Sequence, residues 1–367
     1  MFCGIGVYTL RVIVSSIGAI IERHRTLEAH SPGARISVSV IVPARNEEDN
    51  IEDCVRSIFA CNYGRGDFQL IVVNDRSSDR TGAILTQLQR EFPQLLVHDT
   101  AESKLDAPGL HGKARAVHQG ILVSSGELVL MTDADCRVAR GWIDGVVDYF
   151  AAKHIGLVAS FTVIDARTPF TMLQALEWSL NHTLAMSGVG LKQPLGCFGN
   201  NLSIRRATYD DIGGYAEIPF SVTEDLALMQ AVDRSNWGIR YACRRDMAVT
   251  TNPAADWGEF FRQHIRWANG GRALGWRATF FVLSSTALWL AFVSSFFVDF
   301  WAAPLLVVGL RLGGDALVLL PSLRLLKRLR LAAALPLAVP FFMLLELVIP
   351  FSLLTRNVHW KGQVFRT

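Results

Sequence analysis

Short apolar runs and helical repeats alternate along the first half of the chain. Apolar runs of strand length, several of them rich in β-branched residues, cover 37–42, 70–73, 95–98, 128–131 and 156–163. Apolar side chains at helical spacing fall between them, at 51–59, 81–92, 114–123 and 142–150. Strands that alternate with helices in this way pair in parallel and carry helices on both faces of the sheet. The pattern therefore predicts an α/β fold with a doubly wound, mostly parallel sheet.

The amino-terminal stretch 1–21 is apolar apart from Arg11 and a few hydroxyl side chains. The basic cluster Arg23-His24-Arg25 follows it. A signal peptide carries its positive residues before the apolar core and a small-residue cleavage site after it, so we expect an uncleaved anchor. Arg11 argues against a membrane-spanning anchor, because an arginine inside a span is costly unless it snorkels or pairs. The basic cluster is expected to keep the following domain cytoplasmic.

Three more apolar stretches occupy 278–354. Residues 278–298 carry no charge and are long enough to cross about 30 Å of hydrocarbon. The second stretch, 302–320, contains Arg311 and Asp315, which are four apart and can pair on one helix face. The third, 331–354, is interrupted by prolines. We expect a multi-pass protein of the cell inner membrane or plasma membrane, with transmembrane helices at both ends of the chain.

The basic tail 355–367 conflicts with a simple count of crossings. The basic loop 324–330 belongs in the cytoplasm by its charge, so a third crossing would put the tail outside. The tail nevertheless carries several basic residues, which favour the cytoplasmic side. A re-entrant third stretch, bent at its prolines, would resolve the conflict, and we state this as a hypothesis.

Overall composition excludes some classes of protein. Hydrophobic residues make up 50% of the 367 residues, and the formal net charge is only +3. So small a charge, with no basic face interleaved with aromatic residues, argues against a nucleic-acid partner. The 6 cysteines are scattered without a C-x-x-C pair. They are typical of reduced thiols rather than of a disulfide framework or a zinc site.

Polar clusters follow three of the expected strands. They occupy 43–48, with Pro43 ending the first strand, 74–79 after the second, and Asp133-Ala134-Asp135 after the fourth. In sheets of this kind, ligands bind outside the carboxyl ends of the strands. Two carboxylates one residue apart suit Mg²⁺ or Mn²⁺, which take oxygen ligands together with substrate phosphates. Aspartate is also common at turns, but three clusters at equivalent positions favour the metal site.

Five motifs occur in order: V-P-A-R-N-E at 42–47, V-N-D-R-S-S-D-R-T at 73–81, D-A-D at 133–135, T-E-D at 223–225 and Q-H-I-R-W at 263–267. Together they resemble the motif set of family 2 glycosyltransferases. More narrowly, they resemble its membrane-embedded branch, with ceramide glucosyltransferases, hyaluronan and cellulose synthases, and bacterial lipid and carotenoid glycosyltransferases. The resemblance covers residues 36 to about 276 and, more loosely, the apolar tail. It implies a GT-A type catalytic domain over 36–256 and an interfacial helix over 257–277.

The resemblance implies roles on the donor side of the site. Asp75 matches the aspartate that binds the uracil or ribose of the donor. Pro43 would begin the loop beneath the base, and Glu47 would support nucleotide contacts. Asp133 would meet the sugar or ribose, and Asp135 would hold Mg²⁺ or Mn²⁺, which neutralises the leaving diphosphate. The alternatives are an Asx-turn for Asp75 and a helix N-terminal charge for Glu47.

The acceptor side follows from the same resemblance. Asp225 matches the general base, and Glu224 beside it is assigned to substrate binding; the alternative is an ordinary acidic helix start. Lys113 lies in a segment similar to the G-K-x-x-A segment of the family, whose lysine lies near the donor. The alternative is a solvated lysine at the start of a helix. Asn200 would line the acceptor side of the sugar pocket, or simply occupy a turn.

The Q-H-I-R-W motif lies on an expected helix from residue 257. Arg266 can bind a diphosphate with two parallel hydrogen bonds, and Trp267 can pack at the pocket or at the membrane surface. Gln263 is assigned to substrate binding with them, and His264 to a structural role. The aromatic and arginine side chains of this helix also fit an interfacial amphipathic helix. Both interpretations can hold together.

We therefore predict an inverting glycosyltransferase that moves a sugar from a nucleoside diphosphate sugar, a UDP-sugar, to a lipid or lipid-like hydroxyl at the cytoplasmic membrane face. Its partners would be the donor, the lipid acceptor and the membrane. A processive polysaccharide synthase is the alternative enzyme, but three short apolar segments offer little material for a secretion channel. A transporter or scaffold with an inactive sugar-nucleotide domain would have lost its acidic positions. All of these are present, at Asp75, Asp133, Asp135 and Asp225.

Overall fold

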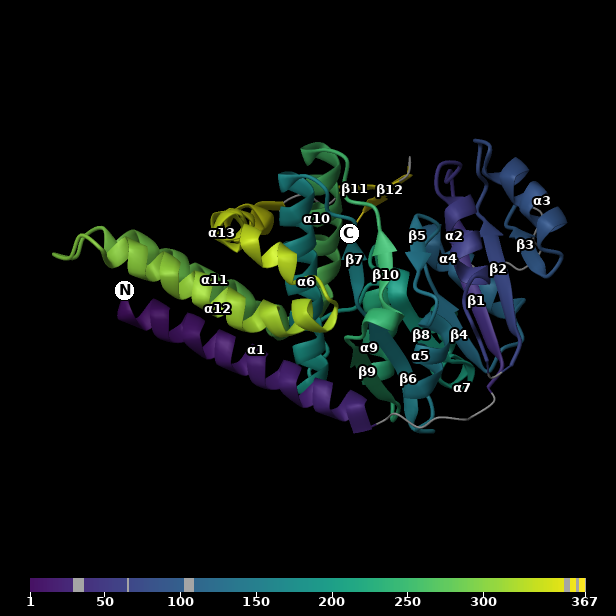
Figure 1. Ribbon diagram of the computed structural model, residues 1–367, viewed down its shortest axis with the longest axis horizontal. Helices are drawn as coiled ribbons and strands as arrows, with labels where there is room; N and C mark the ends of the chain where they lie inside the picture. The colour runs from purple at the N-terminus through teal and green to yellow at the C-terminus, as the bar shows by residue number, and fades with distance from the viewer. Residues whose placement is uncertain (29–35, 65, 102–108, 353–356, 361–362, 367) are drawn as a thin grey trace. The chain divides into compact units, whose positions relative to one another are not determined.

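A computed structural model describes residues 1–28, 36–64, 66–101, 109–352, 357–360 and 363–366 (Figure 1). Contacts divide the chain into two compact units. The helical unit is formed by Met1–Arg23, Ile164–Leu195 and Pro253–Thr367, and the sheet unit by His24–Val163 and Gly196–Asn252. Each unit is assembled from segments that are distant in the sequence.

The sheet unit is built on 7 strands in the spatial order β3-β2-β1-β4-β8-β6-β9 (Figure 1). Their bounds are β1 Val38–Ala44, β2 Phe68–Asn74, β3 Leu95–Asp99, β4 Leu128–Met131, β6 Ile155–Ser160, β8 Leu202–Arg205 and β9 Gly238–Ala242. β8 is antiparallel to β4 and to β6, and the other pairs are parallel. The predicted mostly parallel sheet is confirmed.

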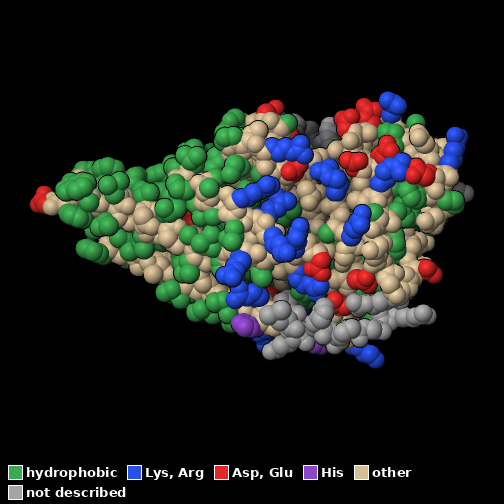
Figure 2. Space-filling model, in the orientation of Figure 1, with side chains coloured by type: hydrophobic (Ala, Val, Ile, Leu, Met, Phe, Trp, Pro, Cys, Tyr) green, Lys and Arg blue, Asp and Glu red, His purple; other side chains and the backbone are tan. Residues whose placement is uncertain are grey.

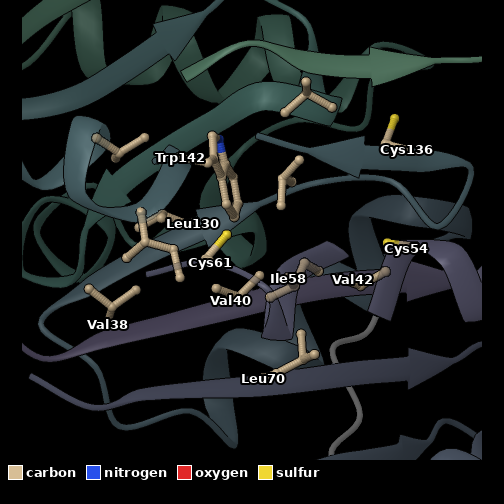
Figure 3. Packing of buried hydrophobic residues seen from close by; sticks show 14 of the residues in the cluster. Val38, Val40, Val42, Cys54, Ile58, Cys61, Leu70, Leu130, Cys136 and Trp142 are labelled. Atoms are coloured by element: carbon tan, nitrogen blue, oxygen red, sulfur yellow. The ribbon is translucent and has the colours of Figure 1, made fainter. Parts of the chain in front are cut away.

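Helices cover both faces of this sheet, as expected. They are α2 Ile51–Phe59, α3 Thr81–Glu91, α4 Gly112–Leu122 and α5 Trp142–Tyr149. Val40 and Val42 pack with α2 and Trp142 in the main core (Figure 3). Successive strand residues point to opposite faces, so Ile41 meets α4 instead. A Cβ on Gly120 of α4 would lie 2.6 Å from Ile41 Cγ2, so glycine lets this helix lie close to the sheet.

A second, smaller sheet departs from the sequence expectation. The strand expected over 156–163 is two strands, β6 and β7 Thr162–Ile164, separated at Phe161. β7 joins β5 Cys136–Val138 and β10 Val249–Thr251 in the order β5-β10-β7. The run concealed the break, because Ser160 and Thr162, which flank Phe161, are as buried as the apolar residues of the two strands.

Pro43 does not end the first strand, which continues to Ala44. The reason lies in the direction of its nitrogen. The Ile41 carbonyl accepts a hydrogen bond from Thr132 N on the β4 side at 3.3 Å, and the Ala44 carbonyl accepts from Asp75 N on the β2 side at 2.8 Å. By strand alternation, Pro43 faces the β4 side, where β4 has already ended at Met131. The missing N–H of proline therefore breaks no ladder.

The helical unit contains the apolar ends of the chain. Its main elements are α1 Phe2–Glu28, α6 Pro169–Gly190, α10 Trp257–Gly271, α11 Trp276–Ser295, α12 Ala303–Leu325, α13 Leu335–Ser352, and the hairpin of β11 Asn357–Trp360 with β12 Gln363–Arg366. Four stretches are long and apolar enough to cross a membrane: Phe2–Arg25, Trp276–Ser295, Ala303–Leu325 and Leu329–Phe351. Apolar helices that could cross a membrane are thus found at both ends of the chain, as expected.

The outer surface of these helices is apolar. Figure 2 shows apolar side chains gathered over α11 and α12 on the face it draws. Leu290 is 66% exposed and Leu305 is 64% exposed. A continuous apolar surface of this kind suits a lipid environment rather than water.

Charged residues inside the apolar stretches face inward and pair. Arg311 is 0% exposed, and its guanidinium lies 2.7 Å from Asp315 and 2.8 Å from Glu346. Arg11 lies 3.3 Å from Glu346. The expected pair between Arg311 and Asp315 is confirmed, and Arg11 gains the partner that its position required. We call Arg11, Arg311, Asp315 and Glu346 the buried charge network.

Helix α6 was not predicted from the sequence. It starts at a capping box in which the Thr168 hydroxyl accepts from Thr171 N, and Pro169 occupies the first turn. It crosses α1 where two glycines meet, since a Cβ on Gly190 would collide with the Gly18 carbonyl oxygen. Small residues at such a crossing let two helix backbones approach closely.

Candidate active site

The loops that follow β1 and β2 bind each other at the carboxyl edge of the sheet. Asn46 Oδ1 accepts from Ser78 N at 2.8 Å, and Glu47 N donates to Thr81 Oγ1 at 2.8 Å. Asn46 has φ 53° and Arg76 has φ 55°. This left-handed conformation is uncommon outside glycine and is found at functional sites where the surroundings hold it. The two loops therefore form one braced edge, in which Glu47 takes part.

Asp75 lies in this edge with its carboxylate buried among cations. Its Oδ1 accepts hydrogen bonds from Thr100 Oγ1 at 2.8 Å, Arg115 Nη2 at 3.0 Å and Arg76 Nε at 3.1 Å. Arg45 Nη1 lies 3.8 Å from Oδ2. Burial raises the pKa of Asp75, but these hydrogen bonds outweigh it and hold the pKa below its ordinary value. The group is therefore ionised at neutral pH.

All three of these arginines were missed by the sequence interpretation, although Arg76 directly follows Asp75. Arg45 and Arg115 lie within the quoted motif segments, but no role was assigned to either. Their partner, Asp75, is 30 residues away from one and 40 from the other, so only the folded sheet edge brings them together. The signal that was available is the arginine directly after β1, at Arg45, and the arginine in the first turn of α4, at Arg115.

Lys113, the second residue of α4, joins the loop after β4 to the start of α9 Glu224–Asp233. Its Nζ lies 2.5 Å from Asp133 Oδ1 and 3.3 Å from Glu224 Oε1, and its side chain is only 17% exposed. Burial lowers the pKa of Lys113, but Asp133 and Glu224 more than compensate and raise the pKa above its ordinary value. Lys113 is therefore a paired cation and not a solvated lysine.

Asp225 stands beside this ion pair at the start of α9. Its Oδ2 accepts from Gly199 N at 2.7 Å and its Oδ1 from Leu226 N at 2.8 Å. A Cβ on Gly199 would lie 3.1 Å from Lys113 Nζ, so the ammonium and the carboxylate converge on one glycine. Thr223 takes the N-cap position without a side-chain capping bond. Capping therefore does not account for the T-E-D motif.

Asn200 and Asp135 complete the set of expected polar residues in the sheet unit. Asn200 lies in the short helix η1 Gly199–Asn201 and is buried; its Oδ1 accepts from Thr162 Oγ1 at 2.8 Å. Asp135 is partly exposed in the loop between β4 and β5, and its Oδ1 accepts from Cys136 Sγ at 3.3 Å. Asn200 thus braces the site from within, while Asp135 lies nearer its surface.

Carboxylates gather around one ammonium at this site. Lys113 pairs with Asp133 and with Glu224, and Asp135 and Asp225 belong to the same loop and the same helix start, respectively. Among the residues that the structure describes, no three potential ligands form a ready-made metal cage. Mg²⁺ and Mn²⁺ are commonly bound by one or two carboxylates plus substrate phosphates. The residues present therefore fit a divalent cation that arrives with a diphosphate.

The Q-H-I-R-W motif lies on α10, in the helical unit. Gln263 and Arg266 are partly exposed. The Trp267 ring packs 5.0 Å from the Trp178 ring of α6. Trp267 thus belongs to an aromatic contact between α10 and α6, and the other two side chains remain accessible on α10.

His264 fixes α10 to α6 from the buried side. Its Nδ1 lies 2.8 Å from the Phe260 carbonyl oxygen, and its Nε2 lies 3.1 Å from Glu177 Oε1. Both neighbours are acceptors, so both ring nitrogens must carry a proton. Burial lowers the pKa of His264, but Glu177 raises it above its ordinary value. The structural role expected for His264 agrees with these contacts.

Known proteins resemble this chain in sequence and in fold. The profile of Glycosyl transferase family 21 matches residues 7–367. Beta-monoglucosyldiacylglycerol synthase of Trichormus variabilis is 29% identical over 268 residues, 70% of this chain and 54% of that protein. Probable glycosyltransferase YdaM of Bacillus subtilis is 28% identical over 253 residues, 67% of this chain and 58% of that protein. The chain thus spans little more than half the length of these curated relatives.

A solved structure shares the architecture. The mannosyltransferase PcManGT of Pyrobaculum calidifontis, in complex with GDP-Man and Mn²⁺, superposes with a TM-score of 0.54 at 18% identity. The match covers 93% of this chain and 99% of that one. At this identity the likeness shows the fold alone.

Proposed function

The chain belongs to glycosyl transferase family 21, and from that membership we propose that it transfers a sugar from a nucleoside diphosphate sugar to a lipid hydroxyl at a membrane. The expected resemblance is confirmed, since family 21 is among the family-2-like glycosyltransferases. The observation that carries the proposal is the convergence of Asp133, Lys113, Glu224 and Asp225 at the carboxyl edge of the sheet.

The lipid acceptor is supported by two independent features. One relative is named as a synthase of β-monoglucosyldiacylglycerol, a lipid product. This chain also has four stretches long and apolar enough to cross a membrane. An acceptor that resides in the bilayer suits an enzyme held there by its own helices. A UDP-sugar remains the proposed donor, with Asp75 as its nucleoside contact.

The proposed chemistry is a direct displacement. Asp225 takes the proton from the acceptor hydroxyl, whose oxygen attacks the anomeric carbon on the face opposite the diphosphate. The bond from that carbon to the diphosphate oxygen breaks, and its electron pair leaves with the diphosphate, so the configuration inverts. The two backbone N–H groups that bind the Asp225 carboxylate orient it for this task. No covalent intermediate on the protein is required.

The remaining residues have proposed roles in binding. Asp135, with Asp133, would hold Mg²⁺ or Mn²⁺, which when bound neutralises the charge on the departing diphosphate. The other proposed substrate contacts are those expected from the motifs: Pro43, Glu47, Asp75, Lys113, Asn200, Glu224, Gln263, Arg266 and Trp267.

A membrane assay with labelled nucleotide sugars tests this function. We expect labelled product in the organic phase with wild-type membranes and none with Asp225→Asn, because the acceptor then keeps its proton. Asp233→Asn, at the other end of α9, is the matched control and should retain activity. Label in an aqueous polymer would instead indicate a processive synthase. Absence of turnover with every donor would contradict the proposal and favour a scaffold.

We also propose that α13 is re-entrant and that the carboxyl terminus lies on the cytoplasmic side. α10 leads into α11, and α12 returns the chain, so α13 starts on the side of α10. The Phe341 ring of α13 lies 5.7 Å from Phe260 of α10, and β11 also contacts α10. The basic loop 324–330 marks this side as cytoplasmic.

This topology predicts that a tag fused after Thr367 is protected from protease added outside intact cells. A tag before Met1 should be cleaved under the same conditions, because α1 crosses once before the basic residues Arg23 and Arg25. Cleavage of the carboxyl-terminal tag in intact cells would refute the re-entrant placement.

A further inference from the structure

Lys113 lies among the carboxylates of the site and pairs with Asp133 and Glu224. We infer that its ammonium holds the place of the divalent cation in the ligand-free protein and is drawn away when the nucleotide sugar binds. Lys113 would then couple metal binding to donor binding, and Glu224 would be its anchor. This inference rests on the proposed function and deepens it, because it assigns a cause to the coupled binding of metal and donor.

The first step is the position of the ammonium between two elements. Asp133 belongs to the loop after β4, whereas Glu224 is the first residue of α9, the helix that carries the candidate base. Nζ is closer to Asp133, at 2.5 Å, than to Glu224, at 3.3 Å. The pair with Asp133 is therefore the main contact in this state, and Glu224 is the second.

The second step is the mobility of a lysine head group. An ammonium is a compact charge on a flexible four-carbon stem, with three donors that can change partners. Lys113 can leave Asp133 by rotating its stem while it keeps its contact with Glu224. Gly199 has no side chain, and a Cβ at this position would lie 3.1 Å from Lys113 Nζ. The glycine therefore leaves space beside the ammonium.

The third step is competition between like charges. While Lys113 neutralises Asp133, a cation that approaches Asp133 and Asp135 meets a positive charge already in place. A diphosphate brings negative charge, to which the ammonium can turn, and this frees Asp133. Metal and donor therefore bind more tightly together than either does alone, and linkage makes the coupling reciprocal.

The test is a titration of purified full-length protein with Mn²⁺ in the absence of nucleotide. Lys113→Met should bind Mn²⁺ about fivefold more tightly than wild type, because the competing charge is gone. The same variant should bind UDP more weakly in the presence of Mn²⁺, also by about fivefold or more. Lys153→Met removes an exposed lysine of the same unit and should change neither affinity. Unchanged or weaker Mn²⁺ binding by Lys113→Met overturns the inference.

Two more variants keep the test decisive. Lys113→Gln removes the charge but keeps a side-chain hydrogen-bond donor, so it should repeat the tighter Mn²⁺ binding even if the methionine variant does not fold. Glu224→Gln removes the anchor and leaves Lys113 to Asp133 alone, so Mn²⁺ should bind about threefold more weakly. Tighter Mn²⁺ binding by Glu224→Gln would contradict its role.

These measurements need no turnover. A protein that transfers no sugar but shows the two opposite shifts in Lys113→Met would retain the inference and lose the proposed function. A protein that transfers sugar to lipid without those shifts would retain the proposed function and refute the inference.

Discussion

Asp225→Asn is expected to lower sugar transfer by about 10²- to 10⁴-fold, the range that a general base contributes. Asparagine keeps the shape of the side chain, but it cannot take a proton from the acceptor hydroxyl. Donor binding should survive, because the groups proposed to bind it, Asp75 and Asp135, lie in other loops of the sheet edge. Transfer to lipid extract and calorimetric binding of UDP with Mn²⁺ measure the two effects separately.

Asp135→Asn should behave differently from Asp225→Asn, because it should lose metal-dependent binding of the donor. Chelation with EDTA should weaken UDP binding by the wild type and add no further loss in Asp135→Asn. Equal loss of donor binding in Asp225→Asn and Asp135→Asn would show that the two residues do not have separate roles.

Arg311→Met is expected to have the largest effect on stability, about 3–5 kcal/mol. The change leaves the buried Asp315 and the partly exposed Glu346 with less positive charge to pair them, and Tyr8 Oη, which donates to Asp315 at 3.1 Å, does not replace a cation. Thermal unfolding in detergent, followed by tryptophan fluorescence, measures the loss. Arg324→Met, an exposed arginine at the other end of α12, is the control and should melt like wild type.

A rescue distinguishes lost charge balance from lost packing. Adding Asp315→Asn to Arg311→Met removes one unpaired negative charge and should restore part of the stability, while Arg11 continues to pair with Glu346. If Arg311→Met unfolds at the wild-type temperature, the buried charge network does not hold the helices together.

The sheet could be predicted from periodicity because its strands are short, apolar and separated by amphipathic helices. Helix α2, Ile51–Phe59, has the bounds that its apolar spacing indicated. Strand β8 was not predicted, because Leu202–Arg205 is too short to carry a periodic signal, and its reversed direction was therefore missed as well. Only its pairing with β4 and β6 reveals it.

Helix α6 escaped prediction because it is buried nearly all round and has no polar face to define a period. Its polar side chains find their partners far along the chain. Gln174 Nε2 donates to the Ala254 carbonyl at 3.1 Å, and Glu177 pairs with His264 at 3.1 Å. The segment 164–195 therefore groups with the terminal helices, although the motif order places it within the expected catalytic stretch 36–256.

The motifs indicated candidate site residues but not their contacts. Asp133, Lys113 and Glu224 were each assigned to the donor or acceptor by resemblance, yet nothing in their spacing indicates one shared ammonium. Lys113 lies 20 residues before Asp133 and 111 before Glu224. Such a contact depends on the folded loops at the sheet edge, which local sequence patterns do not encode.

The buried charge network also has a consequence for synthesis of the chain. Arg11 and its partner Glu346 are 335 positions apart. At ribosomal rates of about 5–20 residues per second, Arg11 waits on the order of half a minute before Glu346 has been made. During that interval Arg11 lacks its carboxylate partner, although the Ser284 and Ser285 hydroxyls that also accept hydrogen bonds from it are made earlier. In a nascent chain stalled before residue 346, α1 should therefore not yet be fixed in the membrane. Completion of α13 should fix its final depth there.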